Sequence, residues 1–261
     1  MPSLDENKAQ WDGDYDWIGR GDEWSVGWGG VSSQWWTTVF PRFQGYLPVR
    51  TVVEIGPGFG RWTHYLKDLC SDLVIVDISA EAIAHCKQRF AMHPHVSAHV
   101  NDGTSLAMIK DGTVDLVFSF DSLVHVEAKV LDTYLEEIAR VLSPDGVAFL
   151  HHSNLGAYPA GSYDPGVTHW RGQSVSAESV DAASGRVGLG CVSQELLAWA
   201  SGQVLTDCIS VITREGSRWD RANVIRENLG FVQEPMLARR RSELYPPSGE
   251  DVSFGAAKRE H

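Results

Sequence analysis

The chain has 261 residues and a formal net charge of −12, with no run of lysine and arginine. It is long enough for one large α/β domain, but it lacks the basic footprint that binds nucleic-acid phosphates. No stretch resembles a membrane span, residues 1–10 lack the apolar core of a signal peptide, and the four cysteines have no zinc-binding spacing. These features exclude nucleic acid and membrane as partners, and we expect a soluble, cytoplasmic protein.

The first 45 residues differ in composition from the rest of the chain, because they contain six of its ten tryptophans. We predict that residues 1–45 form an N-terminal lid or substrate-binding segment and that residues 46–261 form one larger domain. Residues 156–190 are rich in Gly, Ser, Ala and Pro and have weak periodicity, apart from a short helix over residues 177–183. This stretch is predicted to be an insertion over the active site.

From residue 51 onward, short β-branched or apolar runs alternate with segments of helical period. The predicted strands cover residues 51–55, 72–76, 96–101, 114–120, 146–151, 204–213 and 252–257. A helix is predicted over residues 192–200. Strands that alternate with helices are typical of crossover units, so we expect an α/β fold with a doubly wound, seven-stranded, mostly parallel sheet.

The most informative motif is the run VVEIGPGFGRWTH at residues 52–64, where a β-branched strand enters a turn with glycine at Gly56, Gly58 and Gly60. Such a turn lets backbone amides approach a small ligand without obstruction by Cβ atoms. Its G-x-G-x-G spacing differs from the G-x-G-x-x-G of dinucleotide-binding folds. With Glu54 before the first glycine, the motif resembles motif I of the class I S-adenosylmethionine-dependent methyltransferases, which implies a Rossmann-like domain that binds S-adenosylmethionine.

Polar residues follow each of the first five predicted strands, at the edge where open α/β sheets bind ligands. Asp77 lies 21 positions beyond Gly56, where a carboxylate can accept hydrogen bonds from ribose hydroxyls. Asp102 is placed to accept from an adenine amino group. An NAD-dependent enzyme would share Asp77 but would ordinarily have its third glycine one residue later. The candidate cofactor-binding residues are Glu54, Gly56, Gly58, Gly60, Trp62, Asp77, Ile78, Asp102, Gly103 and Asp121.

The segment after the fourth strand, residues 119–125, reads SFDSLVH and lacks the Asn/Asp-Pro-Pro-Tyr motif that the family usually shows for amine acceptors. We therefore expect an oxygen acceptor. A hydroxyl needs a base to remove its proton, and histidine suits that task near neutral pH. His125 and His152 are the candidate bases, with Asp121 orienting the base or the substrate.

A metal is the alternative to simple base catalysis, because Asp121 with His151 or His152 can supply ligands for Mg²⁺ or Mn²⁺. A second acidic segment has Asp12, Asp14, Asp16 and Glu23 at EF-hand-like spacing. It has tryptophan where the calcium loop needs glycine, and we interpret it as a solvated acidic turn.

Aromatic rings and carboxylates of the kind that hold sugars occur together in residues 11–36. The candidate substrate residues are Trp24, Trp28, Trp36, His169 and Arg171. Packing of some of these rings against the sheet is the structural alternative.

The runs at residues 24–30 (WSVGWGG), 118–127 (FSFDSLVHVE) and 151–154 (HHSN), together with motif I, resemble bacterial sugar and polysaccharide O-methyltransferases, among them enzymes that methylate mannose in methylmannose polysaccharide. The resemblance implies a saccharide acceptor, a Mg²⁺ requirement and a homodimer. Two other functions stay open: methylation of a small phenol or carboxylate, and cofactor binding without transfer.

Overall fold

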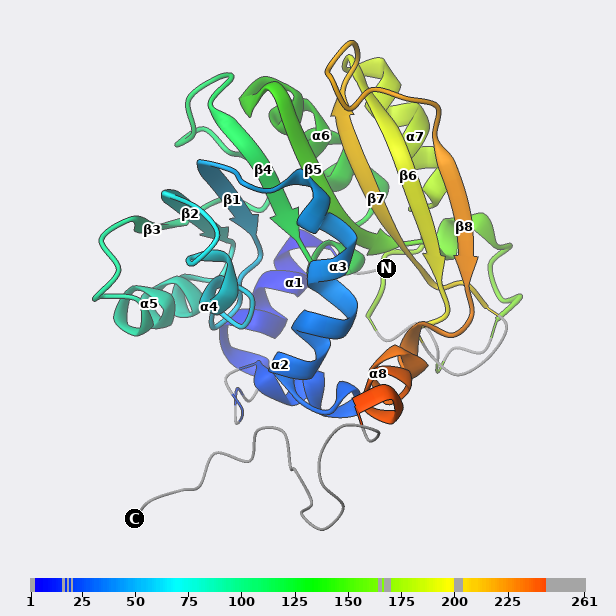
Figure 1. Cartoon of the computed structure of the whole chain (residues 1–261), viewed down its shortest axis with the longest axis horizontal. Coiled ribbons are helices and arrows are strands. Elements are labelled where there is room, and N and C mark those ends of the chain that lie inside the picture. Colours follow the sequence, from blue (N-terminus) through cyan, green and yellow to red (C-terminus); the bar gives the residue numbers. More distant parts are fainter. Residues whose placement is uncertain are drawn as a thin grey trace.

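The computed structural model describes residues 3–15, 17, 19, 21–163, 166, 170–199 and 204–242 (Figure 1). The predicted strand over residues 252–257 and the candidate His169 lie outside this part of the chain. No helix within the described residues is both long and apolar enough to cross a membrane.

The centre of the fold is an eight-stranded sheet in the order β3-β2-β1-β4-β5-β7-β6-β8. Its strands are β1 (Thr51–Ile55), β2 (Asp72–Asp77), β3 (Val96–Val100), β4 (Val114–Ser119), β5 (Leu142–Ser153), β6 (Leu189–Leu197), β7 (Asp207–Arg214) and β8 (Val224–Asn228). Only β7 runs antiparallel to its neighbours within the described sheet. The predicted doubly wound, mostly parallel α/β fold is confirmed, with eight strands where seven were predicted.

The helix predicted over residues 192–200 is wrong, because most of this stretch belongs to β6. Within β6, Cys191 packs in the core on one side of the sheet, and Val192 and Leu197 pack in the core on the other side. A strand that is covered on both faces loses the apolar–polar alternation that identifies a half-exposed strand. Its register also shifts between Cys191 and Ser193, which disturbs the period further.

Helices cover both faces of the sheet. The helical segments are α1 (Leu4–Ala9), η1 (Gln10–Asp14), η2 (Asp22–Trp28), α2 (Val31–Gln34), η3 (Trp35–Val39), α3 (Phe40–Phe43), η4 (Gln44–Tyr46), α4 (Thr63–Leu66), α5 (Ala80–Arg89), η5 (Leu123–His125), α6 (Ala128–Val141), η6 (Leu155–Ala157), α7 (Ala177–Arg186), η8 (Phe231–Gln233) and α8 (Glu234–Ser242). The predicted helix over residues 177–183 lies within α7.

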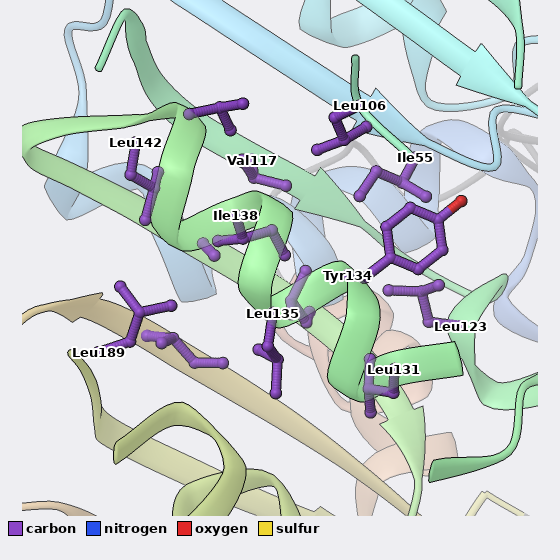
Figure 2. Close-up of a cluster of buried hydrophobic side chains, with 14 of the residues drawn as sticks. Ile55, Leu106, Val117, Leu123, Leu131, Tyr134, Leu135, Ile138, Leu142 and Leu189 are labelled. Carbon is purple, nitrogen blue, oxygen red and sulfur yellow. The ribbon is translucent and has the colours of Figure 1, made fainter. Parts of the chain in front are cut away.

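The helix α6 supplies much of the core on one face of the sheet (Figure 2). Leu131, Leu135 and Ile138 recur at helical spacing and belong to the same buried cluster as Val117 of β4, which lies beside Ile138 in Figure 2. Burial of such side chains contributes roughly 1.5–3 kcal/mol each. These contacts hold α6 against the strands whose carboxyl ends carry the predicted polar residues.

The opposite face is covered by α2, η3, α3, α4 and α5, of which α2 and α3 are seen in front of the sheet in Figure 1. Trp35 and Phe43 are almost fully buried there, and Phe43 contacts Phe118 and Phe149 of the sheet with ring centroids 5.6 and 5.4 Å apart. Part of the segment predicted to be a lid is therefore a packed layer of the core.

Candidate functional site

A cavity of about 390 Å³ lies at the carboxyl edge of the parallel strands. The N-terminal segment, the glycine turn, the ends of β2 and β4 and the segment after β5 all contribute to its wall. The predicted site residues that line it are Gly56, Gly58, Trp62, Asp77, Ile78, Gly103, Asp121, His125, Trp24, Trp28 and Arg171. The predicted residues that do not line it are Glu54, Gly60, Asp102, His151, His152 and Trp36.

The glycine turn needs glycine for steric reasons. Gly56 has φ of 71°, and a Cβ atom there would lie 1.8 Å from Oγ of Ser122. Gly58 has φ of 53°, and its backbone N–H donates to Oδ2 of Asp77 at 3.1 Å. At Gly60 a Cβ atom would lie 2.5 Å from the ring of Phe90, so this third glycine allows the turn to pack on α5.

Asp77 is held at the end of β2 by two backbone donors, Ser79 N–H to Oδ1 at 2.9 Å and Gly58 N–H to Oδ2 at 3.1 Å. Burial raises the pKa of Asp77 to about 6, and these N–H groups oppose that rise because they favour the ionised form. At neutral pH the group is thus mainly a carboxylate with capacity to accept further hydrogen bonds. This is the capacity that a ribose diol requires.

Glu54 lies beneath the turn, with 1% of its surface exposed. Its Oε2 accepts a hydrogen bond from Thr63 Oγ1 at 2.5 Å, whereas its buried Oε1 has no hydrogen-bond partner in the described part of the chain. Burial raises the pKa of Glu54 to about 8. A group that is mainly protonated at neutral pH and shielded from the cavity supports the turn and does not contact a ligand there.

Asp102 does not line the cavity, although its neighbour Gly103 does. Its Oδ1 accepts hydrogen bonds from the backbone N–H groups of Thr104 and Ser105 at 2.9 and 2.8 Å, and these bonds lower its pKa. The carboxylate is exposed and closes its own turn. The role of adenine acceptor that the sequence suggested for Asp102 therefore has no geometric support in this conformation.

Asp121 follows β4 with φ of 63°, a left-handed conformation that costs a residue with a Cβ atom roughly 1–2 kcal/mol. Its Oδ2 accepts a hydrogen bond from Arg61 Nη2 at 2.8 Å, and the side chains of this ion pair are only 13% and 8% exposed. Arg61 also donates to Ser25 Oγ of η2 at 3.3 Å and lies over the ring of Trp62. The pair therefore links the glycine turn, the end of β4 and the N-terminal segment.

His125 lies at the end of η5 and lines the cavity. Its Nδ1 is 3.0 Å from the carbonyl oxygen of Trp170, and a carbonyl can only accept, so Nδ1 carries the proton of the neutral ring. Nε2 is then the basic ring nitrogen. The side chain of Asn7 in α1 bonds both to the carbonyl of His125 and to the indole N–H of Trp170, each at 2.8 Å.

His151 and His152 are both fully buried and neither lines the cavity. His152 contacts the Ser153 carbonyl and the Ser210 hydroxyl, each at 2.8 Å, and burial lowers its pKa to about 4. His152 therefore cannot act as the base of this cavity. Strand alternation instead turns His151 to the cavity side, where it accepts a hydrogen bond from the backbone N–H of Asp121 at 3.1 Å.

The predicted metal site is not supported. No group of three or more His, Cys, Asp or Glu side chains that could hold a metal occurs among the described residues. Asp121 pairs with Arg61, and both ring nitrogens of His151 are engaged, one by the Asp121 N–H and the other by Asp207. In the acidic segment, Asp12 accepts from Ser79 Oγ and the Glu81 N–H at the start of α5, and Asp16 lies outside the described residues.

Of the candidate substrate residues, Trp24 and Trp28 of η2 line the cavity. Trp36 does not: it is 56% exposed and contacts Phe40 on the outside of the N-terminal layer. Arg171 lines the cavity but is almost fully buried in a two-point contact with Asp207, Nε to Oδ1 at 2.5 Å and Nη2 to Oδ2 at 2.8 Å.

The rings of Trp11 and Trp17, which belong to the aromatic segment at residues 11–36, also line the cavity. Several site residues were missed from the sequence, among them four further aromatic residues of the wall: Phe59, Phe120, Tyr134 and Trp199. Trp17 stacks on Phe59 of the glycine turn with centroids 4.4 Å apart. Asp207 was missed because it begins β7, and an antiparallel strand brings its amino end to the edge where parallel strands end. An antiparallel direction for this strand, had it been predicted, is the signal that could have indicated Asp207.

Comparison with known proteins gives a family match for the central part of the chain. Residues 52–146 match the Methyltransf_25 family, described as a methyltransferase domain. The squalestatin hexaketide synthase of Phoma sp. (strain ATCC 20986 / MF5453) is 32% identical over 111 residues, which are 38% of this chain and 4% of that protein. The chain thus spans only a small fraction of this curated relative.

Two solved structures share the fold. The PH0226 protein from Pyrococcus horikoshii OT3 has a TM-score of 0.53 and 21% identity, and the match covers 68% of this chain and 88% of that one. An S-adenosylmethionine-dependent methyltransferase from Clostridium acetobutylicum ATCC 824 has a TM-score of 0.55 and 12% identity, and the match covers 77% of this chain and 96% of that one. Both structures therefore share the fold of this chain, within which residues 52–146 match a methyltransferase domain.

Proposed function

We propose that this protein is an S-adenosylmethionine-dependent O-methyltransferase that methylates a hydroxyl group of a small sugar. The observation that carries the proposal is that the glycine turn, the carboxylate of Asp77 and a histidine with a defined tautomer, His125, line one cavity.

The residues around the turn fit the cofactor. Gly56 and Gly58 line the cavity without a Cβ atom, and a Cβ atom at Gly56 would collide with the side chain of Ser122, so the turn keeps this course only with glycine there. Asp77 would hold the ribose hydroxyls, and Ile78 and Gly103 would contact the adenine ring from the same side of the cavity. When bound, S-adenosylmethionine supplies an electrophilic methyl group, so the chain itself must position a nucleophile and exclude water.

His125 is the proposed base. Its Nδ1–H is oriented by the Trp170 carbonyl, and its Nε2 accepts the proton of the acceptor hydroxyl as the new oxygen–carbon bond forms. Asp121, held by Arg61, accepts a hydrogen bond from the same or a neighbouring hydroxyl and orients it. Neither role requires a metal ion.

The volume and lining of the cavity favour a small acceptor. The cavity has to hold the cofactor as well as the acceptor, and its volume of about 390 Å³ is near the lower end of the range of roughly 300–1,000 Å³ that is common for small-molecule sites. The indole rings of Trp24 and Trp28 offer apolar surface for a sugar ring, while Asp121 and Glu23 offer acceptors for its hydroxyls. A monosaccharide or the end of a short oligosaccharide, with mannosides among the first to test, fits this combination.

A small phenol is the second candidate, because aromatic rings dominate the wall and would stack on a flat acceptor. The carboxylate of Glu23 distinguishes a sugar from a phenol as the acceptor. Glu23 lines the cavity, and its Oε1 accepts a hydrogen bond from Tyr15 OH at 2.8 Å. A sugar has further hydroxyls that can donate to a carboxylate in the wall while one hydroxyl reacts, whereas a flat phenol offers only its one reacting hydroxyl.

The test combines binding with product analysis. Calorimetry with S-adenosylmethionine and S-adenosylhomocysteine measures cofactor affinity for the wild type and for Asp77→Ala. Mass spectrometry then follows a labelled methyl group into mono- and oligosaccharides and simple phenols. We expect tight cofactor binding that Asp77→Ala weakens, and a labelled sugar ether as product. Cofactor binding without any labelled product would favour a non-catalytic binding protein, and a labelled phenol ether would favour the second candidate.

A further inference from the structure

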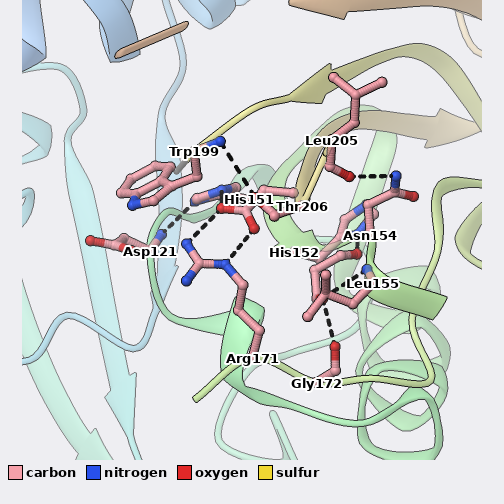
Figure 3. A network of polar contacts seen from close by, with 12 residues as sticks. Asp121, His151, His152, Asn154, Leu155, Arg171, Gly172, Trp199, Leu205 and Thr206 are labelled. Atoms are coloured by element: carbon pink, nitrogen blue, oxygen red, sulfur yellow. Dashed lines mark hydrogen bonds and ion pairs between the residues drawn. The ribbon is translucent and has the colours of Figure 1, made fainter. Parts of the chain in front are cut away.

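A buried chain of polar contacts connects Arg171 to the backbone of Asp121 (Figure 3). Its centre is the carboxylate of Asp207, which is fully buried and accepts two hydrogen bonds from Arg171 and one from His151 Nε2 at 3.1 Å. Burial alone would raise the pKa of Asp207, but Arg171 and His151 hold it well below its usual range. A buried ion pair seldom adds net stability, which leaves its role to be explained by what it positions.

The contacts assign the tautomer of His151. The backbone N–H of Asp121 can only donate, so Nδ1 of His151 must accept and carries no proton. The remaining ring proton is on Nε2, where it is donated to the Asp207 carboxylate. The ring also stacks on Trp199 and contacts Phe120, with centroids 5.0 and 4.6 Å away. His151 is therefore fixed in position and has no nitrogen left to act as a base.

The series of polar contacts that starts at Arg171 ends at Asp121, whose backbone is strained. Asp121 has φ of 63°, and conformations of this kind persist only where the surroundings over-determine them. Two contacts hold it there: the bond from its N–H to His151, and the ion pair of its carboxylate with Arg61. The first fixes the backbone and the second fixes the side chain, so together they aim one carboxylate at the cavity.

We propose that His151 and Asp207 are positioning residues that set the direction of the Asp121 carboxylate toward the acceptor. This inference deepens the proposed function and rests on it for the kinetic part of its test. Asp207 fixes the tautomer of His151, His151 accepts the Asp121 N–H, and Asp121 contacts the substrate. Neither His151 nor Asp207 touches the reacting atoms.

Two substitutions of His151 separate this role from a merely structural one. In His151→Asn the amide oxygen takes the place of Nδ1 and still accepts from Asp121, but the side chain does not reach Asp207. In His151→Gln the amide reaches Asp207 but leaves the Asp121 N–H without its acceptor. If the histidine only neutralises a buried carboxylate, Gln is the better replacement. If it positions Asp121, Asn is the better replacement.

We expect His151→Gln to lower kcat/KM for the acceptor about tenfold to a hundredfold, as small misplacements at a reacting centre do, and His151→Asn to lower it by much less. The dissociation constant for S-adenosylmethionine stays unchanged in both. His152→Asn is the matched control, because His152 is adjacent and equally buried but bonds away from the cavity. Equal losses in the two His151 variants, or a larger loss with Asn, would overturn the proposal.

NMR of the wild-type protein provides a test that needs neither substrate nor variant. Nitrogen shifts of the imidazole should report the Nε2–H tautomer for His151, and a ring with its proton on Nδ1 would contradict the assignment directly. In the variants, the amide proton resonance of Asp121 should keep its hydrogen-bonded position with Asn and lose it with Gln. If the wild type methylates no acceptor, the proposed function fails while these measurements still decide the inference.

Discussion

Replacing Glu54 by glutamine should change how the stability of this protein depends on pH. Glu54 is 1% exposed, and burial is the largest influence on its pKa, which rises from 4.5 to about 8 against the opposing hydrogen bond from Thr63. The folded state therefore holds a proton that the unfolded state releases above pH 4.5. Each pKa unit corresponds to about 1.36 kcal/mol, so Glu54 reduces the unfolding free energy by about 4 kcal/mol between pH 4.5 and pH 8.

The assay is urea unfolding, followed by tryptophan fluorescence, of the wild type and Glu54→Gln between pH 5 and pH 8. Glutamine keeps the size of the side chain but does not titrate, and all other groups contribute equally to both proteins. The stability of the variant relative to the wild type should therefore rise by about 3 to 4 kcal/mol across this range. Thr63→Val removes the hydrogen bond that opposes the rise in the pKa of Glu54. In this variant the unfolding free energy should therefore continue to fall at higher pH than in the wild type. A constant difference between wild type and Glu54→Gln would refute the reasoning.

Three further predictions concern the cavity. His125→Ala should lower kcat about 10²- to 10⁴-fold while leaving calorimetric cofactor affinity unchanged; a near-normal turnover would eliminate His125 as the base. Gly56→Ala should weaken S-adenosylmethionine binding at least about tenfold, because the new Cβ atom would lie 1.8 Å from Ser122 Oγ and the φ of 71° disfavours it; wild-type affinity would show that the turn can shift. Trp28→Ala should raise the acceptor KM and Trp36→Ala should not, since only Trp28 lines the cavity; equal effects would place the acceptor elsewhere.

The central strands could be predicted because their sequence signal is local. β1 begins and ends where the apolar run at residues 51–55 does, and β2 and β4 end within one residue of their predicted limits. The strand predicted over residues 204–213 is β7, which begins three residues later. The signal fails for the two strands beyond it. The two faces of β6 are both buried, and β8 is an exposed segment that forms a strand because it pairs with β6 along its length. Pairing of that kind depends on the rest of the fold, not on the segment itself.

The candidate site was predicted to the extent that backbone topology decides it. Asp77 and Asp121 line the cavity because the carboxyl ends of neighbouring parallel strands meet at one edge. Topology does not say how a side chain is turned. Asp102 occupies an equivalent place but closes its own turn, and Arg61 reaches the site only because η2 and the end of β4 come together beside the glycine turn.

Two histidines near this cavity show how contacts, and not residue type, assign a chemical role. The carbonyl of Trp170 takes the Nδ1 proton of His125, which makes Nε2 its basic nitrogen. At His151 the donors and acceptors are reversed: a backbone N–H occupies Nδ1, and a carboxylate takes the proton of Nε2. The first arrangement leaves an unprotonated nitrogen on a ring that lines the cavity, and the second removes every proton-accepting position from the ring. Because both assignments follow from groups that can only donate or only accept, they hold for the neutral rings whatever the acceptor is.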